Sequence, residues 1–262
     1  MGSVVLPRYL EPPEVVCASI ERLLSYFRQR RRRVEIIVVN DGGSPLQIEE
    51  HADLKLITLG QNRGKGAAVQ AGVAVAESEL VAYCDVDLPV DVDDFGRAFD
   101  SMCAEKWDLF VGSRFSGSLS PAIRAGRWRD LASRTFRWGF HHILVSDIPD
   151  PQCPMKVIRR CAAHRLFDGL IVPGYSFDAE VLYRARRLGL SYLVIPVAWK
   201  DTRGRWGLAK TMEVFGRQIL DLVRIRLFTM RAYRQSDQAR GRTGTDVLCR
   251  SAEEMDNVGV HP

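Results

Sequence analysis

Long apolar runs are missing from this sequence. No stretch approaches the roughly 18 uninterrupted apolar residues that a membrane-spanning helix needs. Residues 1–14 contain neither a basic segment nor a long apolar segment, so we do not expect a signal peptide. These absences predict a cytosolic protein. A chain of 262 residues, 46% of them hydrophobic, is long enough to bury a substantial core.

Paired cysteines and lysines are also scarce. The six cysteines are dispersed without a Cys-x-x-Cys pair, which argues against a disulfide framework and against a zinc site. Only six of the 37 basic residues are lysine, and arginines concentrate at 28–33, at 114–137 and after 217. Arginine binds phosphate groups well, although such a bias can equally follow from the nucleotide composition of a genome. No recognition motif or aromatic stacking platform accompanies the charge, so we expect no nucleic-acid partner.

Strand-like apolar segments and helical periodicities alternate through the first part of the chain. Strands are predicted at 3–7, 34–39, 54–60, 79–85 and 107–113, and helices at 14–28, 65–78 and 92–104. This alternation is typical of a doubly wound, mostly parallel α/β sheet with helices on both faces.

The second part of the chain is less regular. Helices are predicted at 127–144, 176–188 and 207–230, and strands at 154–160 and 190–199. Residues 235–262 are polar and unpatterned, so we expect a single domain over residues 1–234 followed by a disordered tail.

Polar residues follow three of the predicted strands. They lie at 7–11, at 40–42 and at 85–87. In open α/β sheets, ligands bind beyond the carboxyl ends of the strands. The three polar ends therefore predict one ligand site at that edge of the sheet.

Two aspartates, Asp85 and Asp87, stand where the fourth predicted strand ends. In an extended backbone residues i and i+2 point the same way, so both carboxylates are expected to face one small volume. Carboxylate oxygens are ligands that Mg²⁺ and Mn²⁺ prefer, usually together with phosphate oxygens. The pair predicts a metal site for Mg²⁺ or Mn²⁺.

Three further aspartates follow Pro89 at the start of a predicted helix. Asp91 fits an N-cap, and Asp93 and Asp94 fit the first turn, where carboxylates offset the helix dipole. We interpret these three as helix-stabilising residues and not as metal ligands.

A glycine-rich turn, NRGKG at 62–66, precedes the predicted helix 65–78. Its glycine spacing fits neither the P-loop nor the Rossmann pattern. What remains is a turn into a helix N-terminus that carries Lys65, a combination suited to a diphosphate or a sugar. A tight turn without a ligand is the alternative.

Seven short motifs occur in order between residues 3 and 230. They are V-V-L-P-R-Y-L-E, I-I-V-V-N-D-G-G-S, N-R-G-K-G-A-A, D-V-D, V-G-S-R, D-P-Q-C-P-M-K and F-D-A-E-V-L-Y-R-A-R-R-L-G. Together they resemble glycosyltransferase family 2, and within it the branch of polyprenyl-phosphate (dolichol-phosphate) mannose or glucose synthases. The resemblance implies a GT-A fold. It also implies an inverting, metal-dependent hexose transfer from a nucleotide-diphosphate sugar, of the GDP-mannose or UDP-glucose type, to a polyprenyl phosphate.

The resemblance also implies a division of labour along the chain. Residues 1–113 would bind the nucleotide sugar, 114–206 the acceptor, and 207–234 would form an amphipathic helix. The residues implied on the donor side, besides Lys65 and the Asp85–Asp87 pair, are Pro7, Tyr9, Glu11, Asn40, Asp41 and Gln152.

On the acceptor side, the resemblance implies that Arg114, Arg129 and Ser133 receive the acceptor phosphate. Arg205 would contact phosphates from a closing loop, and Lys156 would lie near the reacting sugar. Asp87, Arg114 and Lys156 are therefore the residues expected to carry catalysis.

Another acidic pair, Asp178 and Glu180 in F-D-A-E, matches the family's acidic pair near the acceptor. Two carboxylates that only stabilise a helix N-terminus are the alternative.

The motifs depart from the family pattern at several positions. Leu10 replaces Asn, Asn40 replaces Asp, Pro89 replaces a polar residue, and Pro154-Met155 replace Gly-Phe. These departures keep two alternatives open: a family 2 enzyme with a soluble small-molecule acceptor, and a non-catalytic nucleotide-sugar binder.

Residues 208–230 combine a helical apolar stripe with Arg217, Arg224 and Arg226. An arginine-rich amphipathic helix fits the interface of an anionic membrane, which would place the protein peripherally on the cytoplasmic face. A helix packed on the sheet with its arginines in water is the alternative.

Overall fold

The computed structural model describes residues 2–49, 51–115, 127–145, 147–200 and 208–240. They form a single seven-stranded sheet in the order β3-β2-β1-β4-β6-β5-β7. The strands are β1 (Gly2–Arg8), β2 (Val34–Asp41), β3 (Leu54–Leu59), β4 (Leu80–Tyr83), β5 (Leu109–Ser113), β6 (Lys156–Arg159) and β7 (Tyr192–Pro196). All neighbouring pairs are parallel except those of β6, which runs antiparallel to both β4 and β5.

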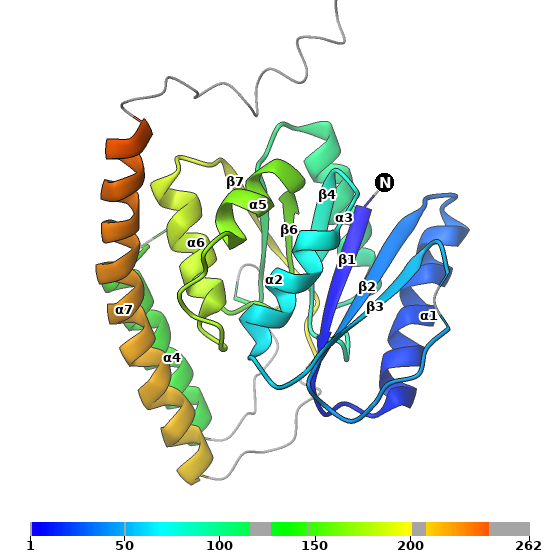
Figure 1. Ribbon diagram of the computed structural model, residues 1–262, viewed down its shortest axis with the longest axis horizontal. Helices are drawn as coiled ribbons and strands as arrows, with labels where there is room; N and C mark the ends of the chain where they lie inside the picture. Colours follow the sequence, from blue (N-terminus) through cyan, green and yellow to red (C-terminus); the bar gives the residue numbers. More distant parts are fainter. Residues whose placement is uncertain (1, 50, 116–126, 146, 201–207, 241–262) are drawn as a thin grey trace, which may run out of the picture.

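Helices cover both faces of this sheet (Figure 1). They are α1 (Pro13–Gln29), α2 (Lys65–Val75), α3 (Val92–Ala104), α4 (Arg127–Ile143), α5 (Arg160–Phe167), α6 (Phe177–Arg187) and α7 (Leu208–Arg240). Helices α1 and α3 pack on one face, whereas α2, α5 and α6 pack on the other, and α7 lies along α4 at the outer side. The predicted doubly wound, mostly parallel α/β sheet is confirmed.

Alternating side chains of the central strands build the two cores. In β1, Val4 and Leu6 are buried against α1 and α3, whereas Val5 is buried against α2. Because β1 and β2 are covered on both faces, they consist of continuous apolar residues, as is typical of parallel sheets.

The structure corrects the predicted elements in three places. The fourth predicted strand, 79–85, ends at Tyr83, because the chain turns immediately afterwards. Helix α5 was not predicted, since its eight residues are too few for a clear periodicity. Helix α7 continues to Arg240, so the first six residues of the expected tail are helical, and residues 241–262 lie outside the described part of the chain.

A small residue lets α2 lie close against β1. A Cβ atom added at Gly72 would lie 2.3 Å from Cγ1 of Val5, whose side chain is fully buried. The close packing of this helix positions Lys65 at its first turn relative to the end of β1.

We expect Gly72→Val to destabilise the protein by about 1–3 kcal/mol, because the added methyl groups overpack the contact between α2 and β1. Urea unfolding followed by circular dichroism measures this change. Gly60→Val is the matched control, since nothing lies within 4 Å of its added Cβ. Equal stabilities of the two variants would contradict this account of the packing.

Candidate active site

The polar ends of three strands lie side by side. Strands β2, β1 and β4 are neighbours and run parallel, so their carboxyl ends meet at one edge of the sheet (Figure 1). The predicted convergence of 7–11, 40–42 and 85–87 is therefore confirmed. We call this region the carboxyl edge.

Asp85 and Asp87 lie on a tight turn and not on an extended strand. The N–H of Leu88 donates to the carbonyl of Asp85 at 3.0 Å, which closes the turn. Val86 and Leu88 are buried, whereas the two aspartates are only partly buried. The expected extended backbone was wrong, but the apolar neighbours anchor the turn and leave both carboxylates at the carboxyl edge.

A cation already lies beside one of these carboxylates. The ammonium of Lys65 is 2.5 Å from Oδ1 of Asp85, and both side chains are largely buried. Among the described residues no cluster of three or more His, Cys, Asp or Glu could hold a metal. Two carboxylates on one turn nevertheless fit Mg²⁺ or Mn²⁺, which commonly bind one or two protein carboxylates and take their other ligands from phosphate oxygens and water.

The glycine turn before α2 is used inside the protein. The carbonyl of Pro173 accepts hydrogen bonds from the N–H groups of Gly66 and Ala67, at 2.7 and 3.2 Å. A Cβ at Gly64, where φ is +99°, would lie 2.5 Å from the same carbonyl. The N–H groups of Gly66 and Ala67 are therefore occupied within the protein, and this part of the motif serves as a tight turn. Lys65 is the part of the motif that remains for a ligand.

Asp41 also supports this turn. Its two carboxylate oxygens accept hydrogen bonds from the N–H groups of Arg63 and Gly64 at 2.7 and 2.8 Å, and the residue is buried. At the carboxyl edge it thus fixes the segment that precedes Lys65.

A buried arginine that the sequence analysis missed joins the ends of β1 and β2. The guanidinium of Arg8 donates to Oδ1 of Asn40 at 2.8 Å and to the hydroxyl of Ser44 at 2.8 Å, and Arg8 is 1% exposed. Asn40 is itself fully buried, and it departs from the family pattern at a position where its side-chain oxygen accepts a hydrogen bond from Arg8. The sequence signal that could have identified Arg8 is an arginine directly after a proline at the end of a predicted strand.

The other donor-side residues of β1 surround this cluster. Pro7 is partly buried in the strand, Tyr9 is exposed, and a carboxylate oxygen of Glu11 accepts a hydrogen bond from the N–H of Tyr9 at 2.9 Å. Tyr9 is thus the aromatic ring that the carboxyl edge offers to solvent.

Arg114 forms a two-pronged ion pair with Asp150. Its Nε and Nη2 atoms lie 2.7 and 2.8 Å from the two carboxylate oxygens of Asp150, which is fully buried. Burial opposes the charge of Arg114, but Asp150 outweighs it and raises the pKa of Arg114 above its ordinary value. Rings of Phe115 and Trp199 flank the guanidinium. Arg114, the residue predicted to bind the acceptor phosphate, is therefore held in a fixed orientation.

A second arginine that the sequence analysis did not single out lies near Arg114. The guanidinium of Arg137 in α4 is 4.0 Å from the centre of the Phe115 ring, and burial, with Arg114 and Arg134 nearby, lowers its pKa. Arg137 lies one helical turn after Ser133, which is partly exposed.

Two predicted acceptor residues cannot be placed fully. Arg129 lies in the first turn of α4, but its side chain is outside the described part of the structure, and Arg205 lies outside it altogether. Gln152 is partly buried in the turn between Asp150 and Cys153.

Lys156 was expected near the reacting sugar, but the structure buries it completely. Its ammonium donates to Oδ1 of Asp178 at 2.7 Å and to the carbonyl of Cys153 at 2.8 Å. The hydroxyl of Tyr83 donates to the same Asp178 oxygen at 2.8 Å, and burial with Asp178 raises the pKa of Tyr83 well above its ordinary value. The expected contact of Lys156 with the sugar is therefore corrected to a positioning role.

Glu180, the other member of the acidic pair, is also fully buried. Its carboxylate accepts hydrogen bonds from the N–H groups of Ile171 and Val172 and pairs with Arg184 at 2.6 Å. It therefore holds the segment whose Pro173 carbonyl binds the start of α2. Asp178 and Glu180 therefore stabilise, from within the core, the segments that form the carboxyl edge.

The three aspartates after Pro89 stabilise α3, as predicted. Asp91 is the N-cap and accepts from the N–H of Asp93 at 3.1 Å. Asp93 pairs with Arg30 at the surface, and buried Asp94 accepts from the N–H of Ala198 at 2.9 Å. Burial raises the pKa of Asp94.

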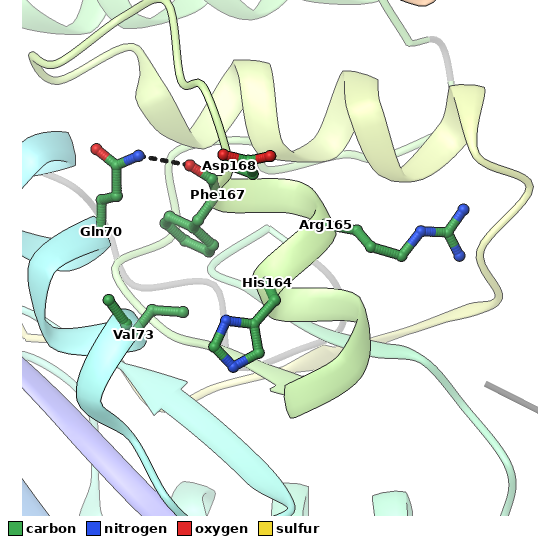
Figure 2. Close-up of a pocket in the computed structure, with 7 residues that line it drawn as sticks. Gln70, Val73, His164, Arg165, Phe167 and Asp168 are labelled. Atoms are coloured by element: carbon green, nitrogen blue, oxygen red, sulfur yellow. Dashed lines mark hydrogen bonds between the residues drawn. The ribbon is translucent and has the colours of Figure 1, made fainter. Parts of the chain in front are cut away.

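A pocket of about 430 Å³ lies away from this edge, between α2 and α5 (Figure 2). It is lined by Gln70, Val73, Ala74, His164, Arg165, Phe167 and Asp168. Gln70 donates to the carbonyl of Phe167 across it at 2.6 Å. None of the predicted site residues lines this pocket, so we place the site at the carboxyl edge on chemical grounds.

We expect Lys156→Met to lower the free energy of unfolding by about 3–5 kcal/mol, because it leaves the Asp178 carboxylate buried without its cation. Chemical denaturation measures the loss, and the double variant Lys156→Met, Asp178→Asn should recover part of it. Exposed Lys106→Met is the control. A stability unchanged by Lys156→Met would disprove the buried ion pair.

Comparisons with known proteins identify the family of this chain. The family model described as Glycosyl transferase family 2 matches residues 3–167. The dolichyl-phosphate beta-glucosyltransferase of Dictyostelium discoideum is 28% identical over 248 residues, which cover 86% of this chain and 73% of that protein. The human protein of the same name is 28% identical over 223 residues, which cover 77% and 68%.

Solved structures confirm the predicted GT-A fold. Mannosyl-3-phosphoglycerate synthase from Rubrobacter xylanophilus matches with a TM-score of 0.58 at 16% identity, over 91% of this chain and 75% of that one. A mannosyltransferase from Pyrobaculum calidifontis, solved with GDP-Man and Mn²⁺, matches with a TM-score of 0.53 at 15% identity, over 84% and 61%. With more than half of its residues matched by the family model, the chain belongs to glycosyl transferase family 2.

Proposed function

We propose that this protein is an inverting hexosyltransferase that uses a nucleotide-diphosphate sugar as donor and a polyprenyl phosphate as acceptor. The observation that carries the proposal is the carboxyl edge, where Asp85 and Asp87 share one turn, Lys65 pairs with Asp85, and Asp85 lies within electrostatic reach of Arg114. This arrangement offers carboxylates to a metal and cations to phosphates. Relatives named dolichyl-phosphate beta-glucosyltransferases support the acceptor class and favour a glucosyl donor over a mannosyl one.

In this proposal the donor binds to the half formed by residues 1–113. The exposed ring of Tyr9 is suited to stack on the base, with Pro7 and Glu11 beside it. Asn40 and Asp41 shape the floor of this half through buried hydrogen bonds. Gln152, in the turn after Asp150, lies beside the donor sugar.

Asp85 and Asp87 would hold Mg²⁺ or Mn²⁺, and Mn²⁺ in the related fold from Pyrobaculum calidifontis supports this choice. When bound, such an ion neutralises charge on the departing nucleoside diphosphate. Lys65 would bind the same diphosphate from the start of α2.

The acceptor phosphate would bind to residues 114–206. Asp150 fixes the fork of Arg114, and Arg137 and Ser133 extend the polar surface along α4. Arg129 and Arg205 remain candidates for the same phosphate. A phosphate nucleophile is already anionic at neutral pH, so orientation by arginines suffices and no carboxylate base is needed. The burial of Asp178 and Glu180 in ion pairs supports this interpretation.

A soluble small-molecule acceptor is the second candidate, and the departures from the family pattern motivate it. Leu10 is 69% exposed beside the proposed base site, which makes the rim of the donor half more apolar. By contrast, Met155 is fully buried in the core and does not line the edge. A soluble acceptor would be glycosylated without lipid in the assay below.

We expect the protein to convert a nucleotide-diphosphate glucose, Mg²⁺ and a polyprenyl phosphate into a sugar that extracts with lipid, and Asp87→Asn to abolish this turnover. The reason is that losing one ligand weakens the metal and diphosphate sites together. Asp93→Asn, the same change a few residues away, should keep near-normal activity, because Asp93 pairs with Arg30 at the surface. Full activity of Asp87→Asn would refute the metal assignment, and no lipid-linked product from any donor would refute the acceptor.

We also propose that α7 contacts a membrane surface peripherally. One face of the helix is buried, with Leu222 and Ile225 packed into the core. The opposite face exposes an apolar stripe with arginines beside it: Met212, Leu220, Val223 and Leu227, flanked by Arg217 and Arg224. Among the described residues, no helix has the length and apolarity needed to cross a bilayer. The exposed stripe fits an interfacial helix on an anionic leaflet.

We expect Leu220→Glu with Leu227→Glu to reduce binding to vesicles of anionic phospholipid at least about tenfold, because two exposed leucines lose their apolar contact with lipid. Vesicle flotation measures this, and thermal unfolding should be unchanged since both residues are exposed. Val75→Glu, at an exposed valine of α2, is the control. Vesicle binding that the double variant leaves unchanged would rule out α7 as the contact.

A further inference from the structure

The ion pair between Lys65 and Asp85 joins the candidate metal site to the candidate diphosphate site, which bind ligands of opposite charge. Asp85 is a candidate metal ligand, and Lys65 is a candidate diphosphate ligand, yet their charged atoms lie 2.5 Å apart. Their side chains are only 16% and 14% exposed, so water screens the pair weakly. While the pair is formed, the ammonium of Lys65 occupies the position beside Asp85 that a metal ion would need. The carboxylate of Asp85 likewise occupies the position beside Lys65 that a diphosphate would need.

The backbone around each residue is held by contacts of its neighbours. The start of α2 is held by the Pro173 carbonyl, through the N–H groups of Gly66 and Ala67. The turn that bears Asp85 follows Tyr83, whose hydroxyl binds Asp178. Because the backbones are held, rotation of the flexible Lys65 side chain is enough to separate the pair.

We propose that Lys65 is an internal counter-ion of Asp85 that a divalent cation replaces when the nucleotide diphosphate binds. This inference rests on the proposed function. The metal takes over the Asp85 oxygen, and the ammonium moves to the diphosphate. A divalent cation and an ammonium at the same carboxylate repel each other, so metal without diphosphate binds against the charge of Lys65. Metal and nucleotide therefore favour each other's binding.

A purely structural ion pair would behave differently. If Lys65 only stabilised the fold, replacing it would leave the affinity for the nucleotide and the mutual enhancement between nucleotide and metal unchanged. As an internal counter-ion, its removal changes two affinities in opposite directions. The metal alone gains affinity, because Asp85 is released, whereas the nucleotide alone loses affinity, because its cation is gone.

The test measures Mn²⁺ binding by electron paramagnetic resonance of the free ion, and binding of UDP and of GDP by calorimetry. Each ligand is titrated alone and with the other. For Lys65→Met we expect Mn²⁺ alone to bind about fivefold or more tightly than to the wild type, and the nucleoside diphosphate alone to bind about fivefold or more weakly. The mutual enhancement between them should fall by a similar factor.

Two variants serve as controls. Lys65→Arg keeps the cation and should retain the mutual enhancement. Lys106→Met removes one positive charge from an exposed site before the amino end of β5 and should bind as the wild type does. Should Lys65→Met melt early, Lys65→Gln provides the same measurement with a polar side chain.

The outcomes separate the two proposals. Mn²⁺ binding to Lys65→Met no tighter than to the wild type overturns the counter-ion role, even if wild-type metal and nucleotide enhance each other. A wild-type protein that binds neither Mn²⁺ nor a nucleoside diphosphate overturns the proposed function as well.

Discussion

The buried contact of Asp178 with Lys156 and Tyr83 is the interaction on which the carboxyl edge depends. It joins β4, β6 and α6 at the point where the chain leaves the sheet to form the turn with Asp85. A buried carboxylate is tolerated only when its charge and hydrogen bonds are satisfied, so the three side chains fix one another. The arrangement is rigid behind the site, and the freedom to respond to ligands is left to side chains at the surface.

The edge relies on side-chain charge and not on free backbone donors. The N–H groups before and within the first turn of α2 are taken by Asp41 and Pro173. A glycine turn that resembles a phosphate loop thus serves to bring two segments of backbone together. Lys65 and Arg114 are two of the cations at this edge in the described part of the chain, and each already has a carboxylate partner that ligands would have to compete with or use.

Local signals predicted part of this arrangement well. The N-cap at Asp91 was predictable because a cap depends only on the next three residues. The alternation of strands and helices predicted the mostly parallel sheet, in which β2, β1 and β4 are neighbours. Strand β6 was predicted as a strand, but its antiparallel insertion between β4 and β5 was not, since pairing joins segments more than 40 residues apart. Arg8 was missed because its partners, such as Ser44, are brought to it only by the fold.

The amino-acid sequence alone specifies which residue types gather at the carboxyl edge, since apolar runs define strands and polar residues mark where they end. It also determined the family, because seven ordered motifs carry that information. Only the tertiary structure decided which of these polar groups are available. Lys156, Asp178 and Glu180 have the same chemistry as Lys65 and Asp85, but the first three are enclosed by the core and the last two lie at its border. Burial depends on packing between distant segments, and no local pattern records it.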